Sequence, residues 1–273
     1  MGKRCIFCKM TSDGSRSLEH ILPESLGNQD HTLPAGVVCD SCNNYFASSI
    51  EQPVLESGYF RTSRFNRLIP SKRRRIPALS GILLPGFQTE GRFGFHRAEV
   101  SRDTDGKFQI YPEAGAEARV ATGEVNRVII PASGQKPRGQ LFPRFLGKVA
   151  IECMGQRLVR NAPHLLPDFV DDTQIDLLRN YARFGKTGFE WPYSERQIYP
   201  ADFLFPASCA EPYEVLHEWD FLSTEETEVY FVIAILGIEY AINMAGPELE
   251  GYGLWLQRNY DRSPLYPGGL STT

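Results

Sequence analysis

Four of the six cysteines lie in two pairs whose spacing suits a metal ion: Cys5-x2-Cys8 and Cys39-x2-Cys42. Two thiolates three residues apart can hold one ion from a tight turn, and two such turns complete a tetrahedron. A cysteine-poor chain without an apolar leader favours this interpretation over disulfides. Redox chemistry is the alternative, but neither pair opens a helix after a strand. The spacing therefore predicts one structural Zn²⁺.

Three polar residues between and just after the cysteine pairs could do chemistry on a phosphate. His20 can act as a general base at neutral pH. Glu19 and Asn43 offer hard oxygen ligands of the kind that Mg²⁺ prefers. If a strand ends at Glu19-His20, the two side chains leave on opposite faces, one towards a metal and the other towards water. If a helix opens at Cys42-Asn43, Asn43 returns to that metal. This combination is typical of phosphodiester cleavage, in which the metal stabilises the leaving oxygen.

The order of these motifs resembles that of the HNH endonucleases, in particular the subgroup whose ββα-metal finger is held by four cysteines. The resemblance covers about residues 3–56 and rests on Cys5-x2-Cys8, Glu19-His20-Ile21-x-Pro23, Leu26-Gly27 and Val37 to Asn43. It implies that His20 is the general base and that Glu19 and Asn43 hold a catalytic divalent ion, Mg²⁺ or Mn²⁺. It also implies structural zinc on the four cysteines and DNA as the partner, double-stranded rather than single-stranded, with a role in phage defence or a mobile element.

One position departs from the family pattern. The middle Asn of the motif, which ties the loop between the two strands, usually lies five residues before the third cysteine, where this chain has Pro34. Asn28, Asp30 and His31 are candidates to replace it. The alternative function is a catalytically degenerate zinc module that binds nucleic acid or a protein partner, and Pro34 is the feature that favours it.

The motifs divide the chain into three expected segments. Residues 1–56 form the HNH finger, in which zinc substitutes for the apolar core that so short a segment lacks. Residues 57–75 form a basic connector, and residues 76–273 form a larger mixed domain of undefined role. The expected class is α+β: an N-terminal zinc-stabilised ββα-metal finger followed by a larger α+β domain.

Apolar periodicity predicts the elements of the larger domain. Three- and four-residue steps from Phe142 to Leu158 predict an amphipathic helix, on which Lys148 and Glu152 would form an i,i+4 pair at the surface. The expected elements are a hairpin of residues 93–102 and 107–111, a short strand over 127–130, a helix from Asp172 or Thr173 to about Gly185, and strands over 214–222, 228–238 and 240–244. Cys153 and Cys209 are expected to be buried.

Charge is distributed unevenly along the chain. Residues 1–75 hold 11 Lys+Arg against 7 Asp+Glu, a net of +4, whereas the remainder is acidic. A basic stretch on an acidic protein favours a polyanionic partner over a solvated linker. The expected nucleic-acid contacts are Arg61, Arg64, Arg67, Lys72, Arg73, Arg74 and Arg75. The first three would share one face if a helix continues there, and Pro70 would end it.

Composition excludes other classes of protein. The chain has 273 residues, of which 42% are hydrophobic and 23% charged, as in globular proteins. The longest apolar run, Val229 to Ile238, is far shorter than the roughly 20 residues that span a bilayer. No membrane partner is expected, and the expected location is the cytoplasm. A single finger makes one nick, so cleavage of both strands would call for a homodimer.

Overall fold

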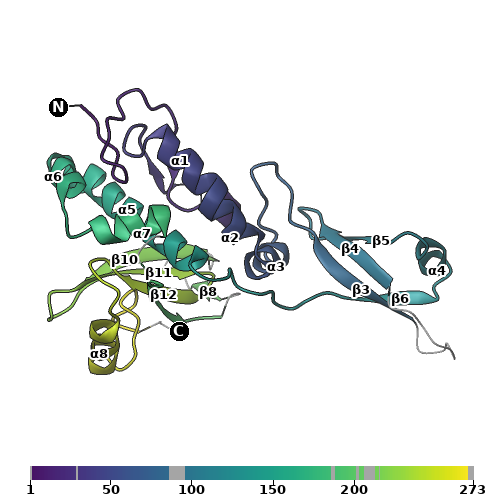
Figure 1. Ribbon diagram of the computed structural model, residues 1–273. Coiled ribbons are helices and arrows are strands. Elements are labelled where there is room, and N and C mark those ends of the chain that lie inside the picture. Colours follow the sequence, from purple (N-terminus) through teal and green to yellow (C-terminus); the bar gives the residue numbers. More distant parts are fainter. Residues whose placement is uncertain are drawn as a thin grey trace. The chain divides into compact units, whose positions relative to one another are not determined.

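The computed structural model describes residues 2–28, 30–85, 96–185, 188–200, 203–205, 213–214 and 216–269. The chain divides into two compact units. Unit 1 comprises Met1–Leu22, Asn28–Glu51 and Arg138–Thr273, and unit 2 comprises Pro23–Gly27 and Gln52–Pro137. This division differs from the three expected segments. Most of the finger clusters with residues from 138 onwards, and the basic stretch clusters with residues 76–137 (Figure 1).

The finger in unit 1 has a ββα arrangement. Strands β1 (Glu19–His20) and β2 (Thr32–Leu33) are antiparallel, with Glu19 opposite Leu33 and His20 opposite Thr32. Helix α1 (Asp40–Phe46) begins within the second cysteine pair, with Cys39 as its N-cap and Cys42 in its first turn, and continues into a π-helical turn, η2 (Ala47–Glu51). The centroids of the Phe7 and Phe46 rings are 4.5 Å apart, so the turn between Cys5 and Cys8 packs against helix α1.

Helix α5 (Leu141–Asn161) is the central element of unit 1. It confirms the helix predicted from Phe142 to Leu158 but not its amphipathic character, because buried side chains lie on all sides of it. Most of its side chains are buried, including Cys153, whereas Cys209 lies outside the described residues. A short turn, η3 (Pro163–Leu165), leads into α6 (Leu166–Asp171). The next helix, α7 (Asp176–Phe184), ends at Gly185 as predicted but begins later than Thr173, because a turn from Thr173 to Asp176 precedes it.

Unit 1 also contains an antiparallel sheet in the order β10-β11-β12-β7 (His217–Ser223, Val229–Ile235, Ile238–Asn243, Ser194–Gln197). Figure 1 shows α5 and α7 on one face and α8 (Glu250–Arg258) on the other. Because both faces are covered, nearly all of β11 is buried. The strand expected over 228–238 ends early, since Leu236 and Gly237 form a tight turn with positive φ angles of 53° and 82°. A two-residue pair, β8 (Leu204–Phe205) and β9 (Tyr213–Glu214), completes unit 1.

Unit 2 is built on a second antiparallel sheet in the order β5-β4-β3-β6 (Phe108–Pro112, His96–Arg102, Leu79–Pro85, Val125–Ile129). The β4–β5 pair confirms the predicted hairpin, apart from residues 93–95, which lie outside the described residues. The helices of unit 2 are η1 (Glu24–Leu26), α2 (Gln52–Glu56), α3 (Gly58–Asn66) and α4 (Glu117–Ala121). Phe65 of α3 packs on Leu79 and Val100, which forms the core of the sheet's covered face.

Within the ranges that the structure describes, no helix is both long enough and apolar enough to cross a bilayer.

Candidate active site

The four paired cysteines converge as the spacing predicts. The four Sγ atoms lie within 4.8 Å of one another, and those of Cys8 and Cys39 are 3.7 Å apart. A tetrahedral Zn²⁺ with Zn–S bonds of about 2.3 Å requires Sγ atoms about 3.8 Å apart. The Sγ of Cys5 accepts hydrogen bonds from the backbone N–H groups of Phe7 and Cys39. A hydrogen bond from Cys42, with help from these N–H groups, lowers the pKa of the Cys5 thiol to about 5 despite its burial. The same hydrogen bond raises the pKa of Cys42, and burial raises that of Cys8, so the protein environment favours a thiolate at Cys5 in particular, and the charge of a metal ion would favour thiolates at Cys8 and Cys42.

Helix α7 holds the first cysteine pair in place. Arg179 is 2% exposed and its Nε donates to the backbone carbonyl of Ile6 at 2.8 Å. Lys9 forms an ion pair of 2.6 Å with Asp176 at the start of the helix. Arg183 points its guanidinium at the Sγ of Cys42. A cationic donor at this place offsets the negative charge of four thiolates around one Zn²⁺.

Glu19 and His20 leave β1 on opposite faces, as expected of neighbours in a strand. Glu19 is 4% exposed and its Oε1 lies 2.8 Å from Nζ of Lys148 on α5. Its Oε2 is buried and has no hydrogen-bond partner among the described residues. The His20 side chain is half-buried. The two residues that the sequence pairs thus have separate environments, one ionic and enclosed, the other partly open to solvent.

Lys148 is the centre of a buried cluster of charges. Its Nζ lies 2.5 Å from Glu51 Oε1 and 2.8 Å from Glu152 Oε2, in addition to Glu19. Lys148 and Glu152 are both 0% exposed, so the prediction of a surface pair is wrong. Burial alone would lower the pKa of Lys148, but the three carboxylates raise it well above its ordinary value. Burial also raises the pKa of Glu152 far above that of a free carboxyl, although Lys148 opposes this.

Asn28 ties the loop between the two strands. It is fully buried, and its Nδ2 donates to the carbonyls of Leu22 at 2.7 Å and His31 at 2.9 Å. Its Oδ1 accepts from the backbone N–H groups of Asp30 and His31. Of the three candidates suggested by the sequence, Asn28 performs the task that Pro34 cannot, because one amide satisfies four groups across the loop.

Asn43 lies in the first turn of α1, next to Cys42 of the four-cysteine cluster. It directly follows Cys42, and its backbone N–H donates to the carbonyl of Cys39 at 3.0 Å. Its side chain is half-buried. The helix begins at Asp40, two residues before the expected opening at Cys42-Asn43, and Asn43 belongs to the same ββα arrangement as Glu19 and His20.

Comparison with protein families agrees with this geometry, since residues 5–57 match the family model described as HNH endonuclease. Residues 5–57 form an HNH endonuclease domain. The match spans the cysteine cluster, Glu19, His20 and Asn43. No curated protein and no solved structure matches the chain.

The basic residues expected to contact nucleic acid all belong to unit 2, and the structure separates them into two groups. On α3, Arg61 donates to the carbonyl of Ala78 at 2.6 Å, and Arg64 is only 6% exposed. Burial lowers the pKa of Arg64, and the nearby charge of Arg61 adds to this. Arg67 follows the helix as its C-cap and is half-buried. Lys72 to Arg75 are all exposed, in a turn closed by the bond from Ser71 N–H to the Arg75 carbonyl. Arg61 is exposed too but is bonded to the Ala78 carbonyl, so this turn is the largest accessible group of the seven.

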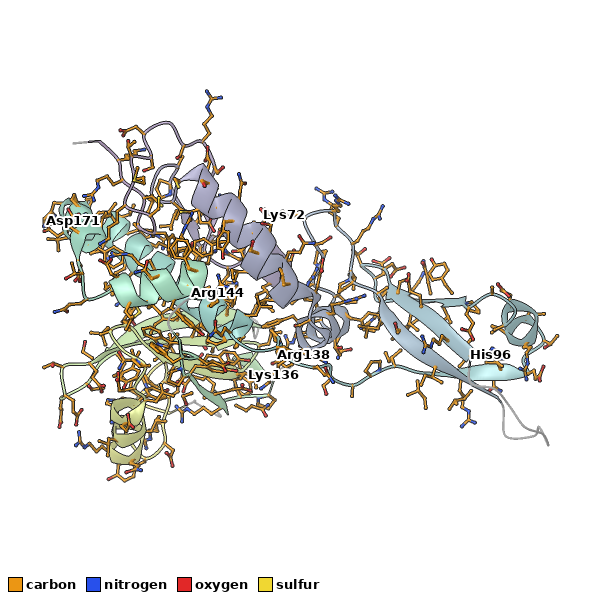
Figure 2. The ribbon with its side chains drawn as sticks, viewed as in Figure 1. Lys72, His96, Lys136, Arg138, Arg144 and Asp171 are labelled. Atoms are coloured by element: carbon orange, nitrogen blue, oxygen red, sulfur yellow. The ribbon has the colours of Figure 1, made fainter. Side chains whose placement is uncertain are left out.

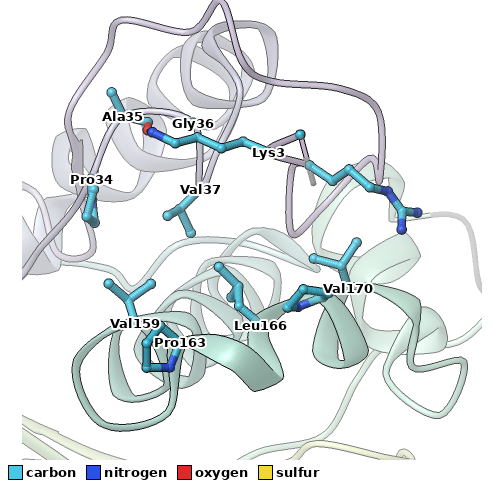
Figure 3. Close-up of a pocket in the computed structure, with 12 residues that line it drawn as sticks. Lys3, Pro34, Ala35, Gly36, Val37, Val159, Pro163, Leu166 and Val170 are labelled. Atoms are coloured by element: carbon cyan, nitrogen blue, oxygen red, sulfur yellow. The ribbon is translucent and has the colours of Figure 1, made fainter.

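A cavity of about 320 Å³ lies between the HNH domain and helices α5 and α6 of unit 1 (Figure 3). Its walls are mainly apolar side chains such as Val37, Val159 and Leu166. Its two cationic residues are already engaged: Lys3 donates to the carbonyl of Ala35, and Arg4 pairs at 2.8 Å with Asp171, which is labelled in Figure 2. The cavity is therefore an apolar space between packed elements, and the described residues of its lining present no reactive side chain.

Sequence reasoning missed three residues that shape the site. Glu51 carries no motif and comes at the end of a π-helical turn, a feature often found near functional sites. Lys148 and Arg183 are more than 90 positions from the residues that they contact in the HNH domain. Only the i,i+4 spacing of Lys148 and Glu152 drew attention to one of them, and that spacing does not distinguish a buried pair from an exposed one.

Proposed function

We propose that the protein is a metal-dependent endonuclease that hydrolyses phosphodiester bonds in DNA. The observation that carries this proposal is an HNH domain whose strand β1 presents Glu19 and His20 on opposite faces beside a four-cysteine cluster. His20 acts as the general base that takes a proton from the attacking water. The half-buried position of its side chain supports this role, since a base must reach both water and a phosphate.

Glu19 and Asn43 would hold the catalytic divalent ion, Mg²⁺ or Mn²⁺. Support comes from Glu19 Oε2, a buried carboxylate oxygen without a hydrogen-bond partner among the described residues. Such an oxygen is costly to bury unless a cation or donor satisfies it, and the amide oxygen of Asn43 is a ligand of the same hard type. When bound, the ion supplies charge stabilisation for the leaving oxygen.

Unit 2 would contribute most of the binding affinity for DNA. Its sequence holds 14 Lys+Arg against 9 Asp+Glu, a net of +5, whereas the whole chain is at −4. Lys72, Arg73, Arg74 and Arg75 are the strongest candidates for phosphate contacts because all four are exposed. The proposal has three further parts. The substrate is double-stranded DNA in the cytoplasm, and a homodimer cleaves both strands. The biological role is in phage defence or in a mobile element.

The competing function is a catalytically degenerate zinc module that binds nucleic acid or a protein. One observation favours it: Glu19 Oε1 is already paired with Lys148, which leaves the carboxylate one oxygen for a metal. The hydrogen bonds of Asn28 favour the nuclease instead, because they hold the loop between β1 and β2 although Pro34 replaces the usual Asn.

Nicking of a supercoiled plasmid distinguishes the two functions. The wild-type protein should convert it to the open circle with Mg²⁺ or Mn²⁺ and not with EDTA. His20→Ala should slow cleavage by about 10²–10⁴-fold, the usual contribution of a general base, while DNA binding is retained. His164→Ala, at an exposed position of unit 1, is the matched control and should cut at the wild-type rate. Binding without metal-dependent cleavage would establish the degenerate module instead.

A further inference from the structure

One face of α5 is hydrogen-bonded to both strands of the HNH domain. Lys148 and Gln156, two turns apart, each make contacts across to it. Nζ of Lys148 lies 3.3 Å from the carbonyl of His20 and 3.2 Å from that of Ile21, at the end of β1. Nε2 of Gln156 donates at 3.1 Å to the carbonyl of Thr32 in β2. A helix from the second half of unit 1 thus supports the strand pair that carries His20.

The contacts of Lys148 concentrate on the backbone around His20. The ammonium meets the side chain of Glu19 and the carbonyls of the next two residues, so three successive residues share one cation. Glu51 and Glu152 complete an enclosure of five oxygens around a group with three N–H donors. A compact ammonium fits such an enclosure, whereas a planar guanidinium does not.

We propose that Lys148 is a positioning residue that sets the location of His20, and hence of the reacting water, from outside the HNH domain. The inference rests on the proposed nuclease function. Strand β1 is only two residues long, so its ladder to β2 defines the His20 backbone weakly. The Ile21 N–H extends the pairing by donating to the His31 carbonyl at 3.0 Å, and Lys148 adds a constraint from a different element, since it is fully buried on a 21-residue helix. A catalytic group must be held within about 0.5 Å of its productive position, which makes such support consequential.

Histidine-ring NMR tests the positioning directly and does not depend on cleavage. The chain has five histidines, so the spectrum is simple, and the His20 signals are assigned with His20→Gln. Lys148→Met with Glu152→Met removes the ammonium and one buried carboxylate together. We expect the His20 signals to shift or broaden, while those of His96 in unit 2 stay in place. Lys148→Arg keeps the positive charge and should also shift the His20 signals, because its fork cannot match the enclosure.

Cleavage kinetics provide the second measurement. Both variants should lower kcat per folded molecule by about tenfold or more, with the KM for plasmid DNA within about twofold of wild type, since a misplaced group costs rate rather than binding. The control is Arg144→Met. Arg144, labelled in Figure 2, also projects from α5 but bonds to the Tyr45 hydroxyl and the carbonyls of Ala182 and Arg183, not to β1. It should leave the His20 signals and kcat unchanged.

The outcomes separate positioning from support of the fold alone. If a folded variant keeps the wild-type His20 signals and the wild-type kcat, the inference is overturned. If Lys148→Met with Glu152→Met does not fold, Lys148→Arg decides, and wild-type behaviour of that variant overturns the inference equally. If the wild-type protein does not cut DNA, the proposed function fails, while the NMR comparison still decides whether Lys148 positions His20.

Discussion

Arg183 of α7 donates through its guanidinium to the Sγ of Cys42, which joins the metal cluster to a helix more than 130 residues away in the sequence. The Arg183 guanidinium also lies over the Tyr45 ring, 5.4 Å from its centroid, so its orientation is fixed by packing as well as by the sulfur. The four-cysteine site therefore depends on residues outside the matched domain.

The zinc site should bind one Zn²⁺ per chain and lose it faster without Arg183. Loss of a partner to a metal ligand typically costs 10–100-fold in metal affinity, so Arg183→Met should speed zinc transfer to a chelator by about tenfold or more. Arg258→Met, whose partners Glu225 and Glu226 are at the surface, is the control. The measurement is zinc release followed with a chromogenic chelator. Equal release rates for Arg183→Met and wild type would refute the role of Arg183.

The Asn28 tie should be important for stability. Asn28→Ala removes a fully buried amide and leaves backbone groups of Leu22 and His31 without partners. At about 1–3 kcal/mol for each of these two buried groups left unsatisfied, the unfolding free energy should fall by about 2–6 kcal/mol. Urea denaturation of Asn28→Ala measures this, with the exposed Asn44→Ala as control. A loss no larger than that of the control would show that the loop holds without the tie.

Stability should decrease in mild acid because of His217. Burial, followed by the nearby charge of His31, lowers the pKa of His217 to about 4, and both ring nitrogens lack a partner among the described residues. The unfolded chain, with a His pKa near 6.5, binds the extra proton first, so the stabilisation present above about pH 6.5 is lost as pH falls towards 4. The loss should reach at most about 3 kcal/mol. Thermal unfolding against pH should show a flatter profile for His217→Gln than for wild type or His164→Gln.

The basic turn should control the salt dependence of DNA binding. Reversing Arg73, Arg74 and Arg75 to Glu removes exposed cations that form no ion pair among the described residues. Each lost phosphate contact flattens the slope of log affinity against log salt by about 0.9, so the slope should fall by up to about 3. If these arginines instead tether acidic residues, the triple variant would lose stability and keep its salt slope. Fluorescence anisotropy and thermal unfolding on the same variant distinguish these results.

Local patterns were sufficient to predict much of the HNH domain and several helices and strands. The cysteine pairs, the Glu19-His20 strand and α1 depend on neighbours within a few residues or on fixed motif spacing. The later elements follow apolar periodicity, and that signal located α5 and the β4–β5 hairpin. Its limit is visible at Leu236 and Gly237, where an unbroken apolar run hid a hairpin turn.

The environment of Glu19 could not be predicted in the same way. Its cation comes from Lys148, 129 positions later, and the apolar residues around Lys148 resemble those of any buried helix face. An i,i+4 Lys–Glu pair usually lies in solvent, because burying charge is costly without further partners. Glu19 and Glu51 are those partners, and only the folded chain shows that they reach Lys148.

The division of unit 1 into early and late segments has a consequence for synthesis on the ribosome. The strand pair that carries His20 is complete at Leu33, yet the helix that binds the carbonyls of His20 and Ile21 begins only at Leu141. A nascent or prematurely terminated chain that stops before this helix lacks Lys148 and the α7 residues beside the cysteines. We therefore expect the nuclease domain to mature only when the later half of the protein has been translated.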